Sequence, residues 1–221
     1  MSLPGLVESA LPSVPGFDCD TVISAVVAEQ FYTQGYKFCI RYVSIGQESS
    51  SDLTEQEATS ILSCGLALMP VQHTRSPGWS PTRQLGLQDG GNAGANAQSV
   101  GFPPGVNLWC DLEGVGSSAQ TLDIVRYCDA WFEAVAEAGY APGVYVGAAA
   151  QLTGQQLYDL PFQHYWRSQS VVPDVPNRGY QMFQLFPSIE INGIEVDIDV
   201  ANSDREGGRP QWLRMESFPL S

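Results

Sequence analysis

Hydrophobic and polar positions follow two periods along the chain, one typical of strands and the other of helices. Alternating or continuous apolar stretches predict strands over residues 16–20, 37–43, 66–72, 107–113, 143–147, 163–168, 181–186 and 194–200. Apolar residues three and four positions apart predict helices over residues 21–34, 54–65, 89–99, 117–139 and 151–158. Two of these helices have a predicted cap, a capping box from Thr54 to Glu57 and a cap at Ser117 or Ser118. Residues 73–88 fit neither period and predict a long loop.

Strands that alternate with helices predict a parallel α/β architecture. This number of strands in 221 residues predicts a TIM-like (β/α) barrel. Its last three strands lack regular intervening helices, because residues 169–179 contain two prolines and residues 187–193 fit a turn. We expect residues 1–14 to be an irregular lead-in and residues 15–221 to form a single domain. A doubly wound sheet is the alternative, but residues 16–18 are not the glycine-rich turn that it needs.

Composition narrows the classes of partner. The net charge of −14 argues against nucleic acid and against anionic lipid as partners. No stretch is apolar enough to span a membrane, and the N-terminus does not resemble a signal peptide. The chain has five cysteines without a Cys-x-x-Cys pair and only two histidines, so we predict no cofactor, no metal and no Ser-His-Asp triad. We expect a monomer.

The candidate chemistry centres on the strand at residues 107–113. Alternation places Asn107, Trp109, Asp111 and Glu113 on one face of this strand. Asp111 and Glu113 then stand side by side at its C-terminal end, with Cα atoms roughly 6–7 Å apart. Two carboxyl groups so close cannot both ionise easily, so the pKa of one should rise. A raised acid beside an ionised carboxylate is the pair that glycoside hydrolysis uses. Two solvated acids in a loop are the ordinary alternative.

Other acids reach the same end of the barrel if the sheet closes. Asp18 ends the first strand, and Asp197 and Asp199 share one face of the last strand with Glu195. Closure makes the first and last strands neighbours and brings these acids to Asp111 and Glu113. Aromatic and amide side chains at other strand ends would line the same opening and suit a sugar ring: Tyr42, His73, Tyr145, Trp166 and Gln184. Taken singly, each of these five also has an ordinary place in a core or a loop.

These residues resemble a known family, the family-25 glycoside hydrolases or muramidase-type lysozymes. The chain is similar too to the related bacterial glycoside-hydrolase-like domains of unknown function. The resemblance covers roughly residues 15–202 and rests on motifs in the same order: Gly16-Phe17-Asp18, Asp111-Leu112-Glu113, Tyr145, Trp166, Phe183-Gln184-Leu185 and residues 193–199. It departs at Asp20, where Ser is usual, at Gln72 and Thr74, which are usually aromatic, and at Asp199, where Asn is common.

The resemblance implies a barrel whose last three strands lack helices, and an extracellular or cell-envelope location. It implies that Glu113 is the general acid and Asp111 the assisting carboxylate, with Asp18 and Asp197 completing an acidic floor. We therefore expect a hydrolase of a β-linked amino-sugar polymer such as peptidoglycan. Two alternatives stay open. One is a non-catalytic glycan-binding barrel, and the other is a metal-dependent hydrolase that holds Ca²⁺ or Mg²⁺ through Asp18, Asp111, Glu113, Asp197 and Asp199.

Overall fold

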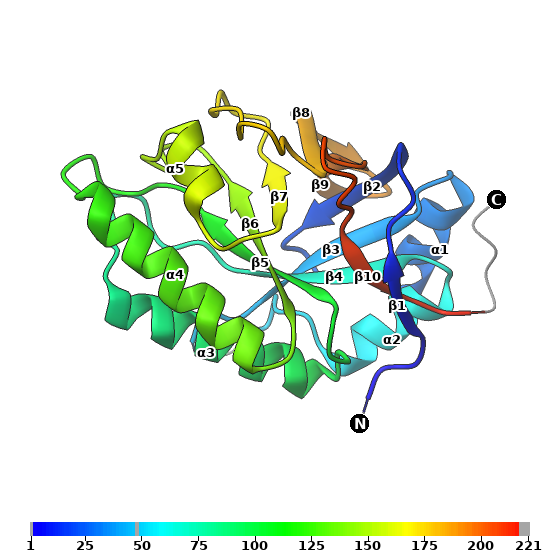
Figure 1. The fold of residues 1–221 in the computed structure, drawn as a ribbon. Helices are drawn as coiled ribbons and strands as arrows, with labels where there is room; N and C mark the ends of the chain where they lie inside the picture. Colours follow the sequence, from blue (N-terminus) through cyan, green and yellow to red (C-terminus); the bar gives the residue numbers. More distant parts are fainter. Residues whose placement is uncertain (1, 47–48, 217–221) are drawn as a thin grey trace.

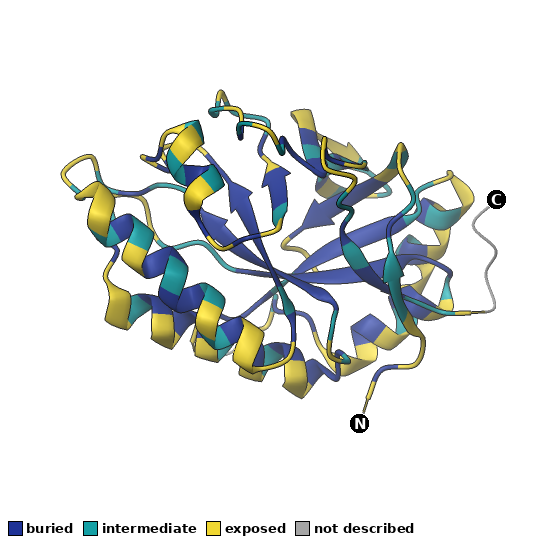
Figure 2. Cartoon of the chain, viewed as in Figure 1, coloured by how far each residue is buried: buried dark blue, intermediate teal, exposed yellow. Residues whose placement is uncertain are grey.

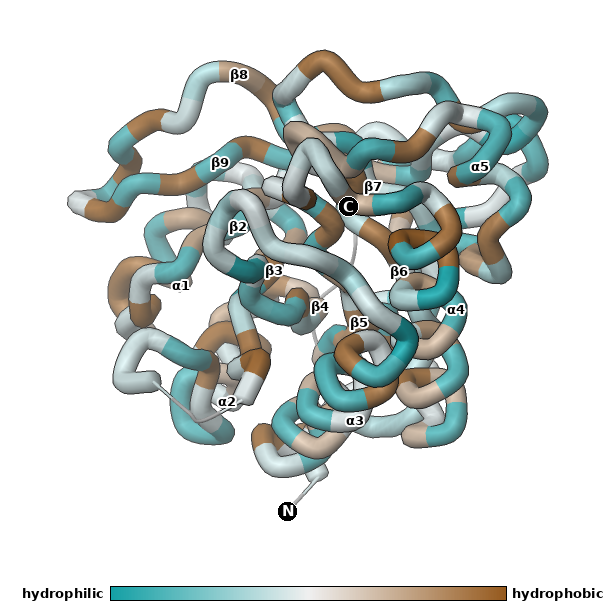
Figure 3. Tube along the Cα trace, turned by 90° about the vertical axis from the view of Figure 1, so that its left-hand side faces the viewer, coloured by the Kyte–Doolittle hydropathy of each residue, from teal (hydrophilic) through white to brown (hydrophobic). Residues whose placement is uncertain are grey.

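A closed barrel dominates the computed structural model, which describes residues 2–46 and 49–216. Its strands are β2 (Val14–Cys19), β3 (Phe38–Val43), β4 (Ala67–Gln72), β5 (Asn107–Leu112), β6 (Ala141–Val146), β7 (His164–Arg167), β8 (Met182–Ile191) and β9 (Ile194–Ala201). They pair in the order β4-β3-β2-β9-β8-β7-β6-β5, and β5 returns to β4. Figure 3 shows these strands as a ring with the helices outside it. The predicted TIM-like barrel is confirmed.

Helices cover the outside of the barrel (Figure 1): α1 (Ala25–Thr33), α2 (Glu55–Ser63), α3 (Arg83–Val100), α4 (Thr121–Glu137) and α5 (Gly154–Asp159). Strands β3 to β6 are almost wholly buried, most of β8 is exposed, and the long helices expose one side, as Figure 2 shows. This difference follows from their sequences, since the strands are mostly apolar and the helices are amphipathic. No helix within the described residues has the length and hydrophobicity needed to cross a membrane.

Two helix predictions were wrong in detail. Helix α3 begins at Arg83 rather than Asp89, with Thr82 as its N-cap, so part of the predicted loop is helical. The apolar period is weak there because α3 packs against α4 through glycines. A Cβ atom on Gly86 would lie 2.2 Å from the Tyr127 carbonyl oxygen. Helix α4 starts at Thr121 without a side-chain cap, so Ser117 and Ser118 do not cap it.

The last two barrel strands form a hairpin. The predicted turn at residues 187–193 was wrong, because β8 continues to Ile191 and the chain reverses at residues 192–193. Strand β9 therefore runs antiparallel to both of its neighbours, β8 and β2. This reversal places Asp197 directly opposite Asp18 in the strand register. The carboxyl end of β2 thus lies beside the amino-terminal half of β9.

Two short strands, one near each end of the chain, extend the sheet where two barrel strands pair only weakly. Strands β4 and β5 share only the pairing of Val71 with Trp109. Strand β10 (Gln211–Arg214) pairs with β4 and also with β1 (Leu6–Ser9), which lies inside the predicted irregular lead-in. The Asn107 side chain of β5 accepts a 2.5 Å hydrogen bond from the backbone N–H of Gln211. Residues 217–221 of the predicted domain lie outside the described residues.

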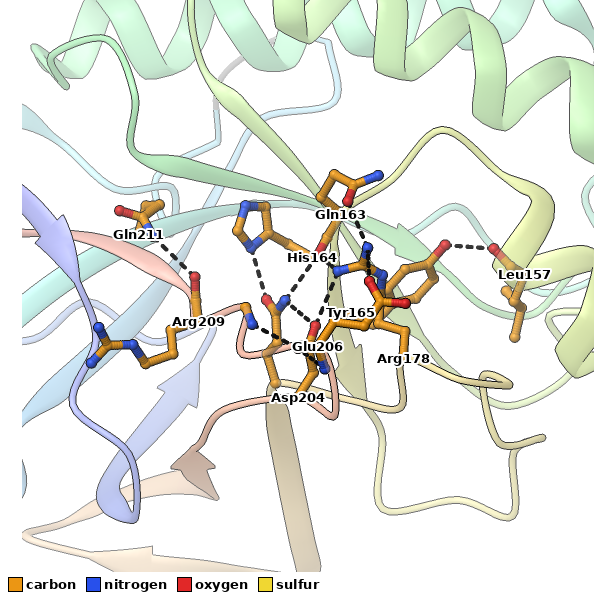
Figure 4. Close-up of polar contacts among 11 residues, drawn as sticks. Leu157, Gln163, His164, Tyr165, Arg178, Asp204, Glu206, Arg209 and Gln211 are labelled. Carbon is orange, nitrogen blue, oxygen red and sulfur yellow. Dashed lines mark hydrogen bonds and ion pairs between the residues drawn. The ribbon is translucent and has the colours of Figure 1, made fainter.

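A polar network holds the β7–β8 connection, which has no helix. Asp204 accepts hydrogen bonds from Arg178 at 3.1 Å and from the Gln181 amide at 2.8 Å. Gln181 also contacts the His164 imidazole at 2.7 Å. Figure 4 shows His164, Arg178 and Asp204 in this network. The Asp204 side chain is fully buried and depends on this pairing, whereas Arg178 is partly exposed and also pairs with Glu206 at 2.5 Å. The connection also contributes the buried side chains of Val175 and Tyr180 to the core.

Candidate functional site

The predicted acidic residues meet at the mouth of the barrel. Asp18 lies on β2, Asp111 on β5 and Asp197 on β9, while Glu113 follows β5 directly. Asp18 and Asp111 are 3% and 4% exposed, and Glu113 is half-buried. The register of β2 with β9 and the alternation along β5 place these side chains on the inner surface. Glu195 is exposed at the rim instead of pointing inward.

Gln184 connects the acids of two strands. Its Nε2 atom donates to Asp18 Oδ2 at 2.9 Å and to Asp197 Oδ2 at 3.0 Å. Its Oε1 atom accepts from the Tyr145 hydroxyl at 2.9 Å and from the backbone N–H of Gln169 at 3.3 Å. Ser188 donates a further hydrogen bond to Asp197. Four of the predicted residues therefore form one network, which fixes two carboxyl groups with neutral donors.

Trp166 and Asp199 form the layer beneath this network. The Trp166 indole donates to Asp199 Oδ1 at 2.8 Å. Its ring packs edge-on against Tyr145 at 4.5 Å and against Trp109 at 5.9 Å. Trp166 is 1% exposed and Asp199 has no exposed surface. Both predicted residues thus belong to the site as supports, because neither has open surface for a ligand.

An open cavity of about 410 Å³ lies on the β2 and β9 side of the mouth. Its lining includes Asp18, Asp197, Tyr42 and His73 among the predicted residues. The Tyr42 ring stacks on His73 at 4.7 Å, and His73 Nε2 lies 2.8 Å from Asp52 Oδ1. The volume falls within the range typical of small-molecule sites. The cavity therefore has both aromatic side chains and carboxylates in its lining.

Glu113 is held by groups that the sequence did not indicate. The Trp79 indole donates to the Glu113 carbonyl oxygen at 2.8 Å. Trp79 belongs to the predicted loop, which lies against the segment after β5 through a Gly78 to Gly114 backbone hydrogen bond. A Cβ atom on Gly147 would lie 2.5 Å from Glu113 Oε2, so only glycine leaves room for this carboxyl group. Periodicity carries no information about such contacts between distant loops.

Burial changes the acidity of the whole group. Desolvation raises the pKa of Asp18 to about 7, opposed by the hydrogen bond from Gln184 and reinforced by Asp197. Burial raises the pKa of Asp111 well above its usual value, and the neighbouring Glu113 and Asp18 raise it further. Burial and then Asp197 raise the pKa of Glu113 as well. A raised pKa, which keeps the proton on Glu113 to higher pH, is the property that a general acid needs.

The model of the Rv2525c-like, glycoside hydrolase-like domain matches residues 29–204. The chain belongs to this family. No curated protein matches the sequence.

Solved structures similar to this Rv2525c-like domain share its barrel. The Tat-secreted protein Rv2525c of Mycobacterium tuberculosis is 16% identical, with a TM-score of 0.65, over 89% of this chain and 98% of that one. An uncharacterized protein of B. stearothermophilus is 20% identical, with a TM-score of 0.63, over 85% and 95%. A bacterial lysozyme from Streptomyces coelicolor is 15% identical, with a TM-score of 0.60, over 88% and 94%. At such identities the likeness shows the fold alone.

We also tested whether the acids of this Rv2525c-like domain could form a metal centre. Within residues 2–46 and 49–216, no group of three or more His, Cys, Asp or Glu side chains has a geometry able to hold a metal ion. The Asp18 and Asp197 carboxylates instead receive hydrogen bonds from the Gln184 amide. This neutral donor occupies the position between them that a cation would otherwise take.

Asp199→Asn should stabilise this Rv2525c-like domain at pH 8 and have little effect at pH 4. Burial and the Asp18 carboxyl group raise the pKa of Asp199. A carboxyl group with a raised folded-state pKa holds its proton in the native state and releases it in the unfolded state. Its contribution to stability is therefore complete below its unfolded pKa of about 4 and is lost as the pH rises. We expect a gain in melting temperature of about 2–4 °C at pH 8 for each 1 kcal/mol gained.

Thermal unfolding of both proteins between pH 4 and pH 8 measures this difference. The asparagine keeps an oxygen that can accept from the Trp166 indole, so the fold is retained. Glu137→Gln is the matched control, because Glu137 is exposed at the end of α4. A difference in stability that is constant across the pH range would contradict the prediction.

Proposed function

We propose that the protein is a glycoside hydrolase that cleaves a β-linked amino-sugar polymer, and that peptidoglycan is the first polymer to test. The observation that carries this proposal is the pair of Asp111 near the end of β5 and Glu113 directly after it, with burial raising the pKa of Glu113. The lysozyme-type structures that share the fold support the same class of reaction. Tyr42 offers a sugar ring an apolar face within the cavity.

In this proposal, Glu113 donates its proton to the glycosidic oxygen as the bond to the anomeric carbon breaks. The departing sugar takes that proton, and positive charge develops on the ring that remains. Asp111, together with Asp18, stabilises this charge when ionised. Asp197 and Gln184 hold Asp18 in place through the hydrogen bonds described above. The oxygen of a water molecule then bonds to the anomeric carbon, the water gives up one proton to a carboxylate of the site, and Glu113 regains its proton.

Incubation of the purified protein with purified peptidoglycan tests the proposal directly. Reducing-end assays and mass spectrometry of the soluble products should detect new reducing ends, and the fragment masses identify the bond that is cut. Folded protein that binds glycan but releases no fragments from any amino-sugar polymer would replace the proposal with a non-catalytic glycan-binding barrel.

A chelator arm distinguishes hydrolysis by carboxyl groups from a metal-dependent hydrolase. We expect the same rate of product release with and without excess EDTA, because the proposed steps use only side chains of the chain. Loss of activity with EDTA that added Ca²⁺ or Mg²⁺ restores would favour the metal-dependent alternative.

A further inference from the structure

The charges around the barrel mouth indicate which charge a bound sugar should carry. We propose that the site binds a hexosamine unit whose amino group is free and protonated, in preference to an N-acetylated or anionic sugar. This inference rests on the proposed function, since it names the substrate class of the same site. De-N-acetylated peptidoglycan and chitosan are two sources of this unit.

Carboxylates dominate the cavity wall. Asp18 at the end of β2 and Asp20 just after it lie beside Glu195 and Asp197 of the neighbouring strand β9, and all four line the cavity. No lysine or arginine is among the described residues that line it. Glu195 and Asp20 are exposed, so a ligand meets their charge at the rim. This potential attracts cations and repels the carboxylates that peptide-bearing wall sugars carry.

The cationic groups near the mouth are already engaged. Arg41 is fully buried and pairs with Glu57 at 2.8 Å. Arg75, in the loop after β4, pairs with Asp89 through two hydrogen bonds of 2.8 and 2.5 Å. His73, the basic residue of the cavity lining, contacts Asp52. None of these side chains points its charge at the rim carboxylates, which leaves that charge for a ligand to balance.

A buried acceptor within the mouth also lacks a donor. Asp111 Oδ1 is inaccessible to solvent and has no hydrogen-bond partner among the described residues. Asp111 is not itself in the cavity lining, but it lies beside Asp18, which is, and beside Glu113. An unpaired buried carboxylate is costly, and an ammonium group supplies both the opposite charge and three donors. Such a ligand would also favour the ionised form of Asp111, which the proposed reaction uses.

The test measures binding separately from cleavage. Calorimetric titration of Glu113→Gln with a glucosamine hexamer and with an N-acetylglucosamine hexamer, at pH 6, compares the two sugars without turnover. We expect the glucosamine hexamer to bind at least about tenfold more tightly at low salt. That preference should shrink at 0.5 M salt, because exposed charges are then screened.

Rim variants locate the effect. In the same background, Asp20→Asn and Glu195→Gln should each reduce the preference by about fivefold, the size of one favourable exposed ion pair. Glu137→Gln removes one charge far from the mouth and should leave the preference unchanged. Equal or tighter binding of the N-acetylated hexamer, no binding of either, or no effect of the rim variants would overturn the inference.

Cleavage by the wild type then separates this inference from the proposed function. A glucosamine preference without cleavage of any polymer would keep the inference and remove the proposed activity. Faster cleavage of N-acetylated peptidoglycan than of its de-N-acetylated form would keep the activity and overturn the inference. Comparison of chitosan with de-N-acetylated peptidoglycan identifies the source of the sugar.

Discussion

Glu113→Gln is expected to lower kcat for glycan cleavage by about 10²–10⁴-fold with the fold retained. Glutamine has the size of a protonated glutamic acid but has no acidic proton to give to the leaving oxygen. No side-chain hydrogen bond or ion pair of Glu113 is recorded among the described residues, and the residue is half-buried, so its loss should not unfold the barrel. The change therefore isolates the chemical step.

Initial rates of reducing-end formation across pH 4 to 9 measure this effect. Because burial and Asp197 raise the pKa of Glu113, wild-type activity should persist above the usual titration range of a glutamic acid. It should fall on the acid side, where Asp18 with its pKa of about 7 takes up a proton, and on the alkaline side, where Glu113 loses its proton. In the variant the alkaline fall should be absent from the residual rate. Glu137→Gln serves as the control, and a kcat for Glu113→Gln equal to that of the wild type would remove Glu113 from the mechanism.

Glu57→Gln is expected to destabilise the protein by about 3–5 kcal/mol, the usual cost of leaving one member of a buried ion pair alone. The Arg41 and Glu57 side chains are 0% and 3% exposed. Glu57 Oε1 accepts from Arg41 Nε and from the backbone N–H of Ile23, both at 2.8 Å. Without the carboxylate, the Arg41 guanidinium has no opposite charge in a position that water cannot reach.

Urea unfolding of Glu57→Gln against the Glu137→Gln control measures this cost. Arg41 also donates to the Cys19 carbonyl oxygen at 2.6 Å, so the pair holds the end of β2, where Asp18 lies, and Asp20 just after it. We therefore expect weaker glycan binding before global unfolding. A loss below about 1 kcal/mol would show that the barrel tolerates the unpaired guanidinium, and that this pair does not organise the mouth.

The capping box predicted at Thr54 was only half correct. The motif correctly predicts the start of α2, because Thr54 Oγ1 accepts from the Glu57 N–H at 3.2 Å. The reciprocal half of the box does not form, since the Glu57 side chain turns to Arg41. Local spacing identified the cap. The Glu57 carboxylate instead accepts a hydrogen bond from Arg41, which is sixteen positions away in sequence. Helix propensity and capping are local properties, whereas ion pairing depends on the packed fold.

Alternation in the sequence by itself determined the elements of the barrel and the inward face of β5, with Asp111 and Glu113 at its end. It also determined the order of the acids along the chain, because strand periodicity is a property of neighbouring residues. Tertiary structure alone decided that β9 runs antiparallel, which places Asp197 opposite Asp18. It also decided that Gln184 joins these two acids and that burial raises the pKa of Asp111. Register, desolvation and hydrogen bonding arise between segments far apart in sequence, so no local pattern encodes them.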